Sequence, residues 1–203
     1  MGSPTPDGIQ AVQDDSLFVA TGESCVFIRV TGRGSHKTSP ALKEFCATMM
    51  EKGYRLFIFD LEHCTSMDST FMGVLAGIAR RLPHSTDAVL INLNPKTSEI
   101  LQTVGLDRLV RCNHVGSLDA DLRNKISKIT AGSALGAGKA DKKTAAETVL
   151  AAHEDLVAAC PDNLPEFQNV LEFMRKEVER LGAAGRAPGG IRRADGWERN
   201  DPA

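Results

Sequence analysis

The chain has 203 residues, a length that suits one compact domain with an appendage or two small domains. Hydrophobic residues make up 42% and aromatic residues only 5%, so the core must consist mainly of aliphatic side chains. The formal net charge of -2 does not indicate nucleic acid or an anionic membrane as an obligatory partner.

The cysteines and histidines point to neither a disulfide framework nor a metal site. The five cysteines are widely spaced and contain no C-x-x-C pair: Cys25, Cys46, Cys64, Cys112 and Cys160. We therefore expect reduced thiols in the cytoplasm. No signal-peptide pattern and no apolar run long enough to span a bilayer is present, so no membrane insertion is expected. Neither a metal-ligand spacing nor a cofactor-binding motif is found, and we expect no cofactor.

The first third of the chain predicts a β-hairpin, a helix and a buried strand. Residues 1–15 are polar and rich in proline and glycine, which predicts a disordered lead-in. Two β-type runs, 16–20 and 25–30, flank a glycine-bearing turn and predict the hairpin. Ser-Pro at 39–40 predicts a helix start, with the serine as its cap. The continuous apolar run 55–61 is typical of a central strand.

Strands and helices continue to alternate after a loop that ends at Asp68. The predicted elements are a helix at 71–82, a strand at 88–93, a helix at 94–105, a strand at 109–112 and a helix at 119–129. The whole alternation, over 16–130, predicts an α/β domain with a mixed sheet of about four or five strands and helices packed on it.

The chain changes character beyond this domain. Small and polar residues at 131–146 predict a flexible linker. Apolar residues recur at helical spacing over 148–159 and 165–181, which predicts a helical hairpin within 147–181. Such a hairpin cannot bury its apolar face alone, so it must dock on the domain, on a second copy or on a partner. The rest of the chain, 182–203, is predicted to be a disordered tail.

A candidate site lies where the buried strand leads into the apolar helix, at Asp68, Ser69 and Thr70. All three residue types cap helices well, so a cap without further function is one interpretation. Three such residues stand where one would do, however, and free amides and the helix dipole favour a phosphate there. Phosphorylation adds roughly 1.5–2 negative charges. This charge would repel the neighbouring carboxylate of Asp68, and a partner bound to the neutral loop would be expelled.

Residues 67–75 read Met-Asp-Ser-Thr-Phe-Met-Gly-Val-Leu. This segment resembles the signature of STAS domains, and most closely that of bacterial anti-sigma factor antagonists, Met-Asp-Ser-Ser-Gly-Leu-Gly-Val-Leu. Residues 88–93 and 100–106 are similar to the next strand and helix of the family. The resemblance covers about residues 16–120 and leaves out the C-terminal hairpin.

The resemblance implies a phosphorylation switch rather than an enzyme. An unphosphorylated antagonist binds an anti-sigma factor that is a serine/threonine kinase of the histidine-kinase-like ATPase type. The kinase phosphorylates the second hydroxyl of the motif, here Thr70 with Ser69 as the alternate, and a PP2C-type phosphatase resets it. Asp68, Ser69, Thr70, Phe71 and Met72 would form the partner-binding loop. Phe71 stands where the family has glycine.

Two other functions remain open. The first is a STAS scaffold that couples a receptor, kinase or phosphatase to an output other than a sigma factor, with the hairpin used for assembly or for a homodimer. The second is an enzyme with Ser69 or Cys64 as nucleophile, which would need a nearby base. The chain contains no G-x-S-x-G elbow, and residues 32–39 fail the phosphate-loop pattern. The segment 153–155 is interpreted as a solvated helix face.

Overall fold

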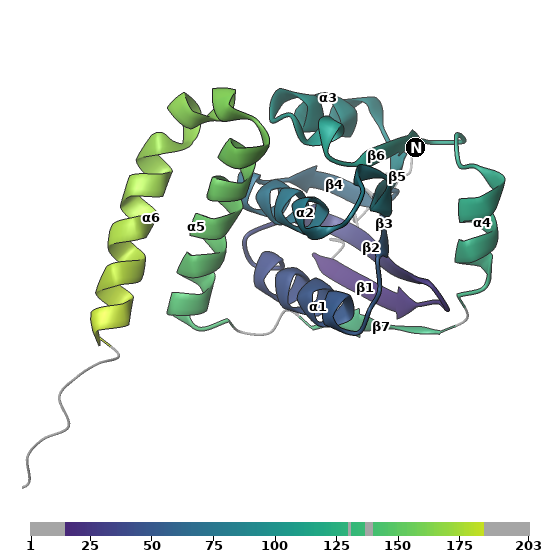
Figure 1. Ribbon diagram of the computed structural model, residues 1–203, viewed down its shortest axis with the longest axis horizontal. Helices are drawn as coiled ribbons and strands as arrows, with labels where there is room; N and C mark the ends of the chain where they lie inside the picture. Colours follow the sequence, from purple (N-terminus) through teal and green to yellow (C-terminus); the bar gives the residue numbers. More distant parts are fainter. Residues whose placement is uncertain (1–14, 130, 137–139, 185–203) are drawn as a thin grey trace, which may run out of the picture.

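The computed structural model describes residues 15–129, 131–136 and 140–184 (Figure 1). Residues 1–14 of the predicted lead-in and 185–203 of the predicted tail lie outside these residues, and the first residues of the predicted tail, 182–184, are instead helical. The strands are β1 (Ser16–Thr21), β2 (Cys25–Gly34), β3 (Leu56–Asp60), β4 (Cys64–Met67), β5 (Ala88–Leu93), β6 (Arg111–His114) and β7 (Gly132–Leu135). The α-helices are α1 (Ser39–Glu51), α2 (Ser69–Arg81), α3 (Pro95–Thr103), α4 (Ala120–Ser127), α5 (Lys142–Ala159) and α6 (Leu164–Ala184). Short 3-10 turns are η1 (Ser85–Asp87), η2 (Leu106–Arg108) and η3 (Pro161–Asn163).

The strands form one mixed sheet in the order β6-β5-β3-β2-β1-β7, with β4 paired to β2 away from this path. The strand β1 is antiparallel to β2 and to β7, and the other pairs are parallel. The predicted α/β class with a mixed sheet, packed helices and a C-terminal helical hairpin is confirmed.

The described part of the sheet has seven strands, whereas about four or five were predicted. Two of the additional strands are β4, in the expected loop before Asp68, and β7, inside the expected flexible linker. Neither carries the alternating apolar pattern of an independent strand. Both form because a neighbour offers free backbone groups: β2 pairs with β4, and β1 pairs with β7.

Both faces of the central strands are covered, which explains their unbroken apolar sequences. Side chains of a strand point alternately to opposite faces. Phe57 and Phe59 of β3 therefore join the main core, while Ile58 lies in the smaller core beneath α4. The main core is completed by α1, α2 and α3.

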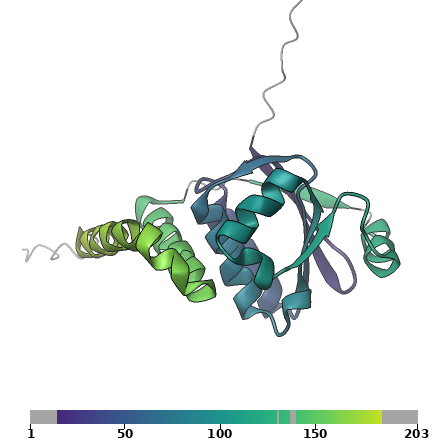
Figure 2. The same cartoon turned by 90° about the horizontal axis from the view of Figure 1, so that it is seen from above.

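The C-terminal hairpin adds a further layer on the side of α1 and α2. Figure 2 shows α4 on one side of the sheet and, on the other, the layer that contains α1 and α2, then α5 and then α6. The helix α5 packs directly on α2, and α6 packs on α5. Of the three docking arrangements expected for the hairpin, the structure shows the one on the domain itself. No helix among the described residues has the length and apolar character needed to cross a membrane.

The predicted boundaries of α5 were too short at the N-terminal end, since the helix begins at Lys142. The first turn is polar and so carries no apolar periodicity. It is fixed by Asp141, whose Oδ1 accepts a hydrogen bond from the Thr144 amide at 2.8 Å.

Candidate functional site

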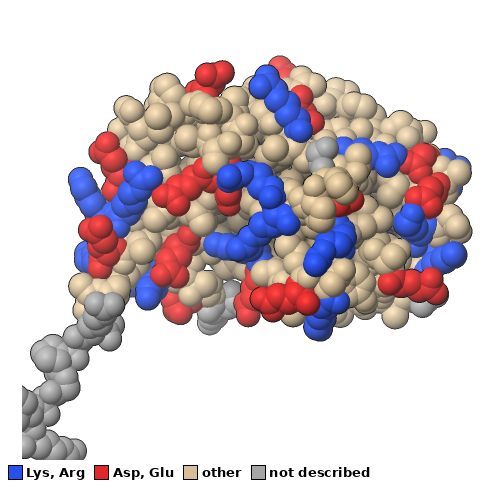
Figure 3. Space-filling view, viewed as in Figure 1, with Lys and Arg blue, Asp and Glu red and all other residues tan. Residues whose placement is uncertain are grey.

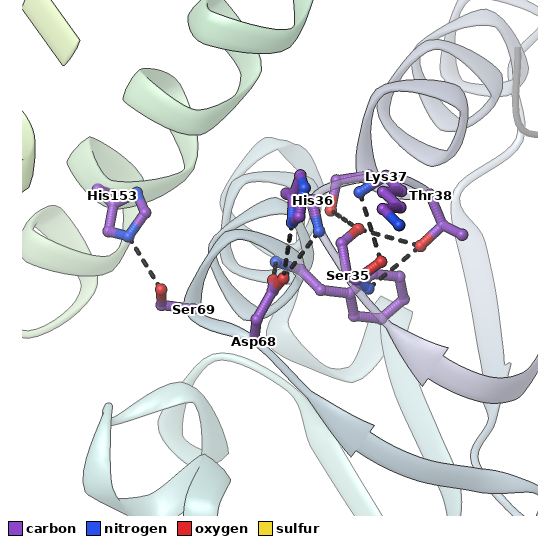
Figure 4. Close-up of polar contacts among 9 residues, drawn as sticks. Ser35, His36, Lys37, Thr38, Asp68, Ser69 and His153 are labelled. Atoms are coloured by element: carbon purple, nitrogen blue, oxygen red, sulfur yellow. Dashed lines mark hydrogen bonds and ion pairs between the residues drawn. The ribbon is translucent and has the colours of Figure 1, made fainter. Parts of the chain in front are cut away.

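Asp68 caps α2 and joins two loops (Figure 4). Its Oδ1 accepts a hydrogen bond from the Phe71 amide at 2.9 Å, which is the expected capping bond. Its Oδ2 accepts another from the His36 amide at 2.8 Å. The Asp68 amide in turn donates to the Gly34 carbonyl at 3.0 Å. The start of α2 is therefore tied to the loop between β2 and α1.

The loop before α1 is held by its own hydroxyl groups. The Ser35 amide donates to Thr38 Oγ1 at 3.2 Å, and the Thr38 and Ser39 hydroxyls both donate to the Ser35 carbonyl. Ser39 was predicted as the helix cap, but it is the first helical residue and Thr38 holds the cap position. Pro40 is therefore the second helical residue, and the helix begins one residue earlier than the Ser-Pro pair predicted.

The predicted partner-binding residues differ in exposure. Thr70 is 5% exposed, Phe71 0% and Met72 6%, whereas Asp68 and Ser69 are half-buried. The ring of Phe71 lies against the backbone of Gly34, where an added Cβ would come within 2.7 Å of it. Phe71 thus fills the core where β2 ends, and the half-buried part of the candidate loop is Asp68 and Ser69.

A residue that sequence reasoning missed, His153 of α5, contacts Ser69. The Ser69 Oγ and His153 Nε2 atoms are 3.0 Å apart, and His153 Nδ1 is 2.8 Å from the Val149 carbonyl oxygen. Since a carbonyl only accepts, Nδ1 carries the ring hydrogen, and in the neutral ring Nε2 accepts from the Ser69 hydroxyl. His153 is 4% exposed and packs edge-on against Phe167. Its interpretation as part of a solvated face was wrong.

The Ser69–His153 pair supplies the base that an enzymatic serine would need, so this alternative requires a second test. A nucleophile also needs space for a substrate above it. Five hollows of the described surface are lined by residues other than Ser69. The other candidate nucleophile, Cys64, is buried, and burial raises the pKa of its thiol, which keeps the unreactive protonated form. Ser69 thus has an imidazole at hydrogen-bond distance but lines none of these five hollows.

Two glycines of α2 allow α5 to approach closely. A Cβ added to Gly73 would lie 2.2 Å from the Ala152 carbonyl oxygen, and one added to Gly77 would lie 2.2 Å from Asp155 Oδ2. Glycine is therefore required at 73 for this approach of two helix backbones, whereas at 77 the nearest atoms belong to the Asp155 side chain. No sequence signal separates these glycines from ordinary helical ones, because the contact depends on a helix about 80 residues away.

A charged cluster lines a hollow of about 290 Å³ beside the same helix contact. Arg80 donates to Asp155 Oδ1 at 2.6 Å, and Lys43 of α1 and Arg81 of α2 also line the hollow. Figure 3 shows basic side chains gathered where α1 and α2 face α5. Burial raises the pKa of Asp155, and the facing cations, Arg80 first, offset this only in part.

A second polar cluster lies at the ends of the parallel strands and has a structural role. Asp60 is 2% exposed; its carboxylate accepts from Arg29 Nε at 2.9 Å and from Asn92 Nδ2 at 2.8 Å. Asn92 adopts a left-handed φ of 58°, which its amide side chain tolerates. Within 15–129, 131–136 and 140–184, no group of three or more His, Cys, Asp or Glu residues could hold a metal ion.

The STAS domain model matches residues 18–121, which is half of the chain, and the protein belongs to the STAS domain family. Similar solved structures include an anti-sigma factor antagonist from Mycobacterium paratuberculosis, at 19% identity and a TM-score of 0.46, covering 61% of this chain and 99% of that one. The anti-sigma factor antagonist SpoIIAA in its unphosphorylated form is 20% identical, with a TM-score of 0.43 and coverage of 55% and 94%. The Bacillus SpoIIAA in its phosphorylated form is 19% identical, with a TM-score of 0.43 and coverage of 54% and 98%. The helices α5 and α6 lie outside the matched segment.

Proposed function

We propose that this protein is a phosphorylation-switched binding module, an anti-sigma factor antagonist in the cytoplasm, and not an enzyme. In the unphosphorylated state it binds a kinase-type anti-sigma factor of the histidine-kinase-like ATPase class. Phosphorylation at the start of α2 releases that partner, and a PP2C-type phosphatase restores binding. The observation that carries this proposal is the position of two hydroxyls, Ser69 and Thr70, in the first turn of α2 directly after the Asp68 cap.

The first turn of a helix is a favourable place for a phosphate because its amides and the helix dipole attract an anion. Of the two hydroxyls, Ser69 is half-buried and Thr70 is 5% exposed. A kinase must reach the acceptor oxygen, and the lower burial of Ser69 favours it as the acceptor. The family resemblance designates Thr70 instead. We take Ser69 as the acceptor and Thr70 as the alternate.

Electrostatics explain how the phosphate would release a partner. A phosphoryl group on Ser69 places roughly 1.5–2 negative charges next to the Asp68 carboxylate. That carboxylate accepts the His36 amide across the two loops. Repulsion between the two anions would weaken this tie, and a partner that fits the neutral loops would lose both charge and shape complementarity.

The test is direct phosphorylation of the purified full-length chain with ATP by each histidine-kinase-like ATPase of the source genome. Phosphopeptide mass spectrometry should place the phosphate on Ser69 in the wild type and in Thr70→Ala, and find none in Ser69→Ala. The exposed hydroxyl of Ser66, three residues before, provides the matched control: Ser66→Ala should be phosphorylated at the wild-type rate. Absence of phosphate from both Ser69 and Thr70 with every kinase would refute the proposal.

The hairpin favours a second candidate, because it lies outside the segment that matches the family. In this reading the protein is a scaffold that couples a receptor, kinase or phosphatase to an output other than a sigma factor. Leu164 and Phe173 of α6 are large apolar side chains that are 48% and 65% exposed. A partner that is no anti-sigma kinase and is lost from Phe173→Glu in a pull-down would favour the scaffold. Sedimentation velocity of the same variant tests self-association through the hairpin.

A further inference from the structure

We propose that the hairpin of α5 and α6 is a detachable cover that occupies the Ser69 surface in place of the partner. The hairpin must leave before Ser69 can be phosphorylated or a partner can bind there. This inference rests on the proposed function of Ser69, and it adds a regulator of that site from within the same chain.

In the docked state the His153 imidazole stands against the acceptor oxygen of the half-buried Ser69. His153 Nε2 lies 3.0 Å from Ser69 Oγ, and the ring is itself held by its second nitrogen on the Val149 carbonyl. A transferable phosphoryl group must come within about 3–3.5 Å of the acceptor oxygen and in line with it. The imidazole occupies this approach, so the kinase and the hairpin compete for the same space.

The contact between α5 and α2 combines close packing of the two backbones with polar links that water can replace. The buried residues of α5 are Ala146, Thr148, Ala152, His153 and Leu156. Only Leu156 among them is a large apolar side chain. The remaining links from α5 to α2 are the Ser69–His153 bond and the Arg80–Asp155 pair, and water can replace the partners of all four groups.

The domain beneath keeps a core of its own when the hairpin moves away. The side chains of Phe57, Phe59 and Phe71 are fully buried between the sheet, α1 and α2. The hairpin contributes Ala152, Leu156 and Phe167 to that core, and Val157 and Val170 pack against it. Opening of the hairpin would expose these side chains and leave the aromatic core between the sheet, α1 and α2 in place, as in the sub-global openings of other proteins.

The two helical glycines provide a matched pair of variants, one that opens the cover and one that locks it. In Gly73→Ala the three nearest atoms to the new Cβ all belong to Ala152, so the substitution pushes on α5 alone, while alanine favours the helical state of α2. A Cβ at Gly77 lies 3.7 Å from the Asp155 Cβ, a separation that suits a disulfide. Gly77→Cys with Asp155→Cys therefore locks the hairpin when oxidised, and reduction releases it.

The position of the hairpin is read without any kinase, from the reaction of His153 with diethyl pyrocarbonate, followed by peptide-resolved mass spectrometry. His36, whose side chain is 60% exposed, serves as the internal reference. We expect Gly73→Ala to accelerate the His153 reaction at least tenfold and the oxidised lock to slow it below the wild-type rate, with reduction restoring it. Gly182→Ala, where the added Cβ meets open space, should match the wild type.

The same variants are then phosphorylated with ATP and the kinase that acts on the wild type. Ser69 phosphate should accumulate faster in Gly73→Ala and slower in the oxidised lock. Equal phosphorylation of locked and opened forms overturns the cover and leaves the proposed function intact. Equal His153 reactivity in the locked and opened forms also overturns it. A third outcome separates the two proposals. If the His153 reaction is faster in Gly73→Ala and slower in the oxidised lock, but no form is phosphorylated, the detachable hairpin is supported and the proposed function is refuted.

Discussion

Asp68 holds the candidate loop together through two backbone amides, and removal of its carboxylate should therefore cost more than loss of an ordinary cap. The capping bond to the Phe71 amide is worth about 1 kcal/mol. The bond from the His36 amide to the other carboxylate oxygen adds about 1.5 kcal/mol, since its acceptor is ionised. We expect Asp68→Ala to lower the free energy of unfolding by about 2–3 kcal/mol. Asp68→Asn keeps one acceptor and should lose about half as much.

The assay is urea denaturation followed by circular dichroism. With a slope of about 2 kcal/mol/M, Asp68→Ala should lower the urea midpoint by roughly 1–1.5 M. Asn94 is the matched control, because it caps α3 through a single bond to the Thr97 amide at 2.8 Å. Asn94→Ala should cost only about 1 kcal/mol. Equal losses for Asp68→Ala and Asn94→Ala, or no loss for Asp68→Asn, would show that the bond from the His36 amide contributes nothing.

Three further predictions test the hairpin contact and the carboxylates of Asp155 and Asp60. Leu156→Ala, at a side chain that is 0% exposed, should destabilise the protein by about 2–5 kcal/mol in the same titration, whereas Phe173→Ala should stay within about 0.5 kcal/mol of the wild type. Burial raises the pKa of Asp155 in the folded state, so near this pKa the folded protein binds more protons at this carboxyl than the unfolded chain does. The free energy of unfolding of the wild type, relative to that of Asp155→Asn, should therefore fall as the pH rises above about 4. A difference between the two proteins that does not change with pH would contradict this. Asp60→Ala leaves the Asn92 amide and the 42% exposed Arg29 side chain without their acceptor and should cost about 1–3 kcal/mol, which thermal melts at two salt concentrations would measure.

The sequence predicts those elements whose apolar pattern is set locally. The unbroken runs of β3 and β5 and the capped start of α2 identify the domain, and the residues of the capping motif identify its family. Elements held by distant backbone groups gave no such signal. The strand β7 has the sequence Gly-Ser-Ala-Leu and exists because β1 has a free edge.

The candidate site was only half predictable for the same reason. Asp68 and Ser69 follow from local capping chemistry, which depends on neighbours in sequence. His153 reaches Ser69 from 84 residues away, and its place among Glu and Asp residues is typical of a solvated face. Its contact exists because Gly73 lets α5 approach, a dependence between two helices that helical periodicity alone does not express.

The pairing of β7 with β1 also limits how far a released hairpin can travel. Residues 136–141 connect the end of β7 to the start of α5, and a fully extended chain of that length spans roughly 20–25 Å. A tether this short keeps the hairpin at a millimolar effective concentration near the Ser69 surface. A partner in solution must therefore compete with the tethered hairpin for the Ser69 surface. The apparent affinity of the partner falls by the fraction of chains in which the hairpin is docked. The length of this tether, as well as the contacts of α5, thus sets the partner concentration at which the switch responds.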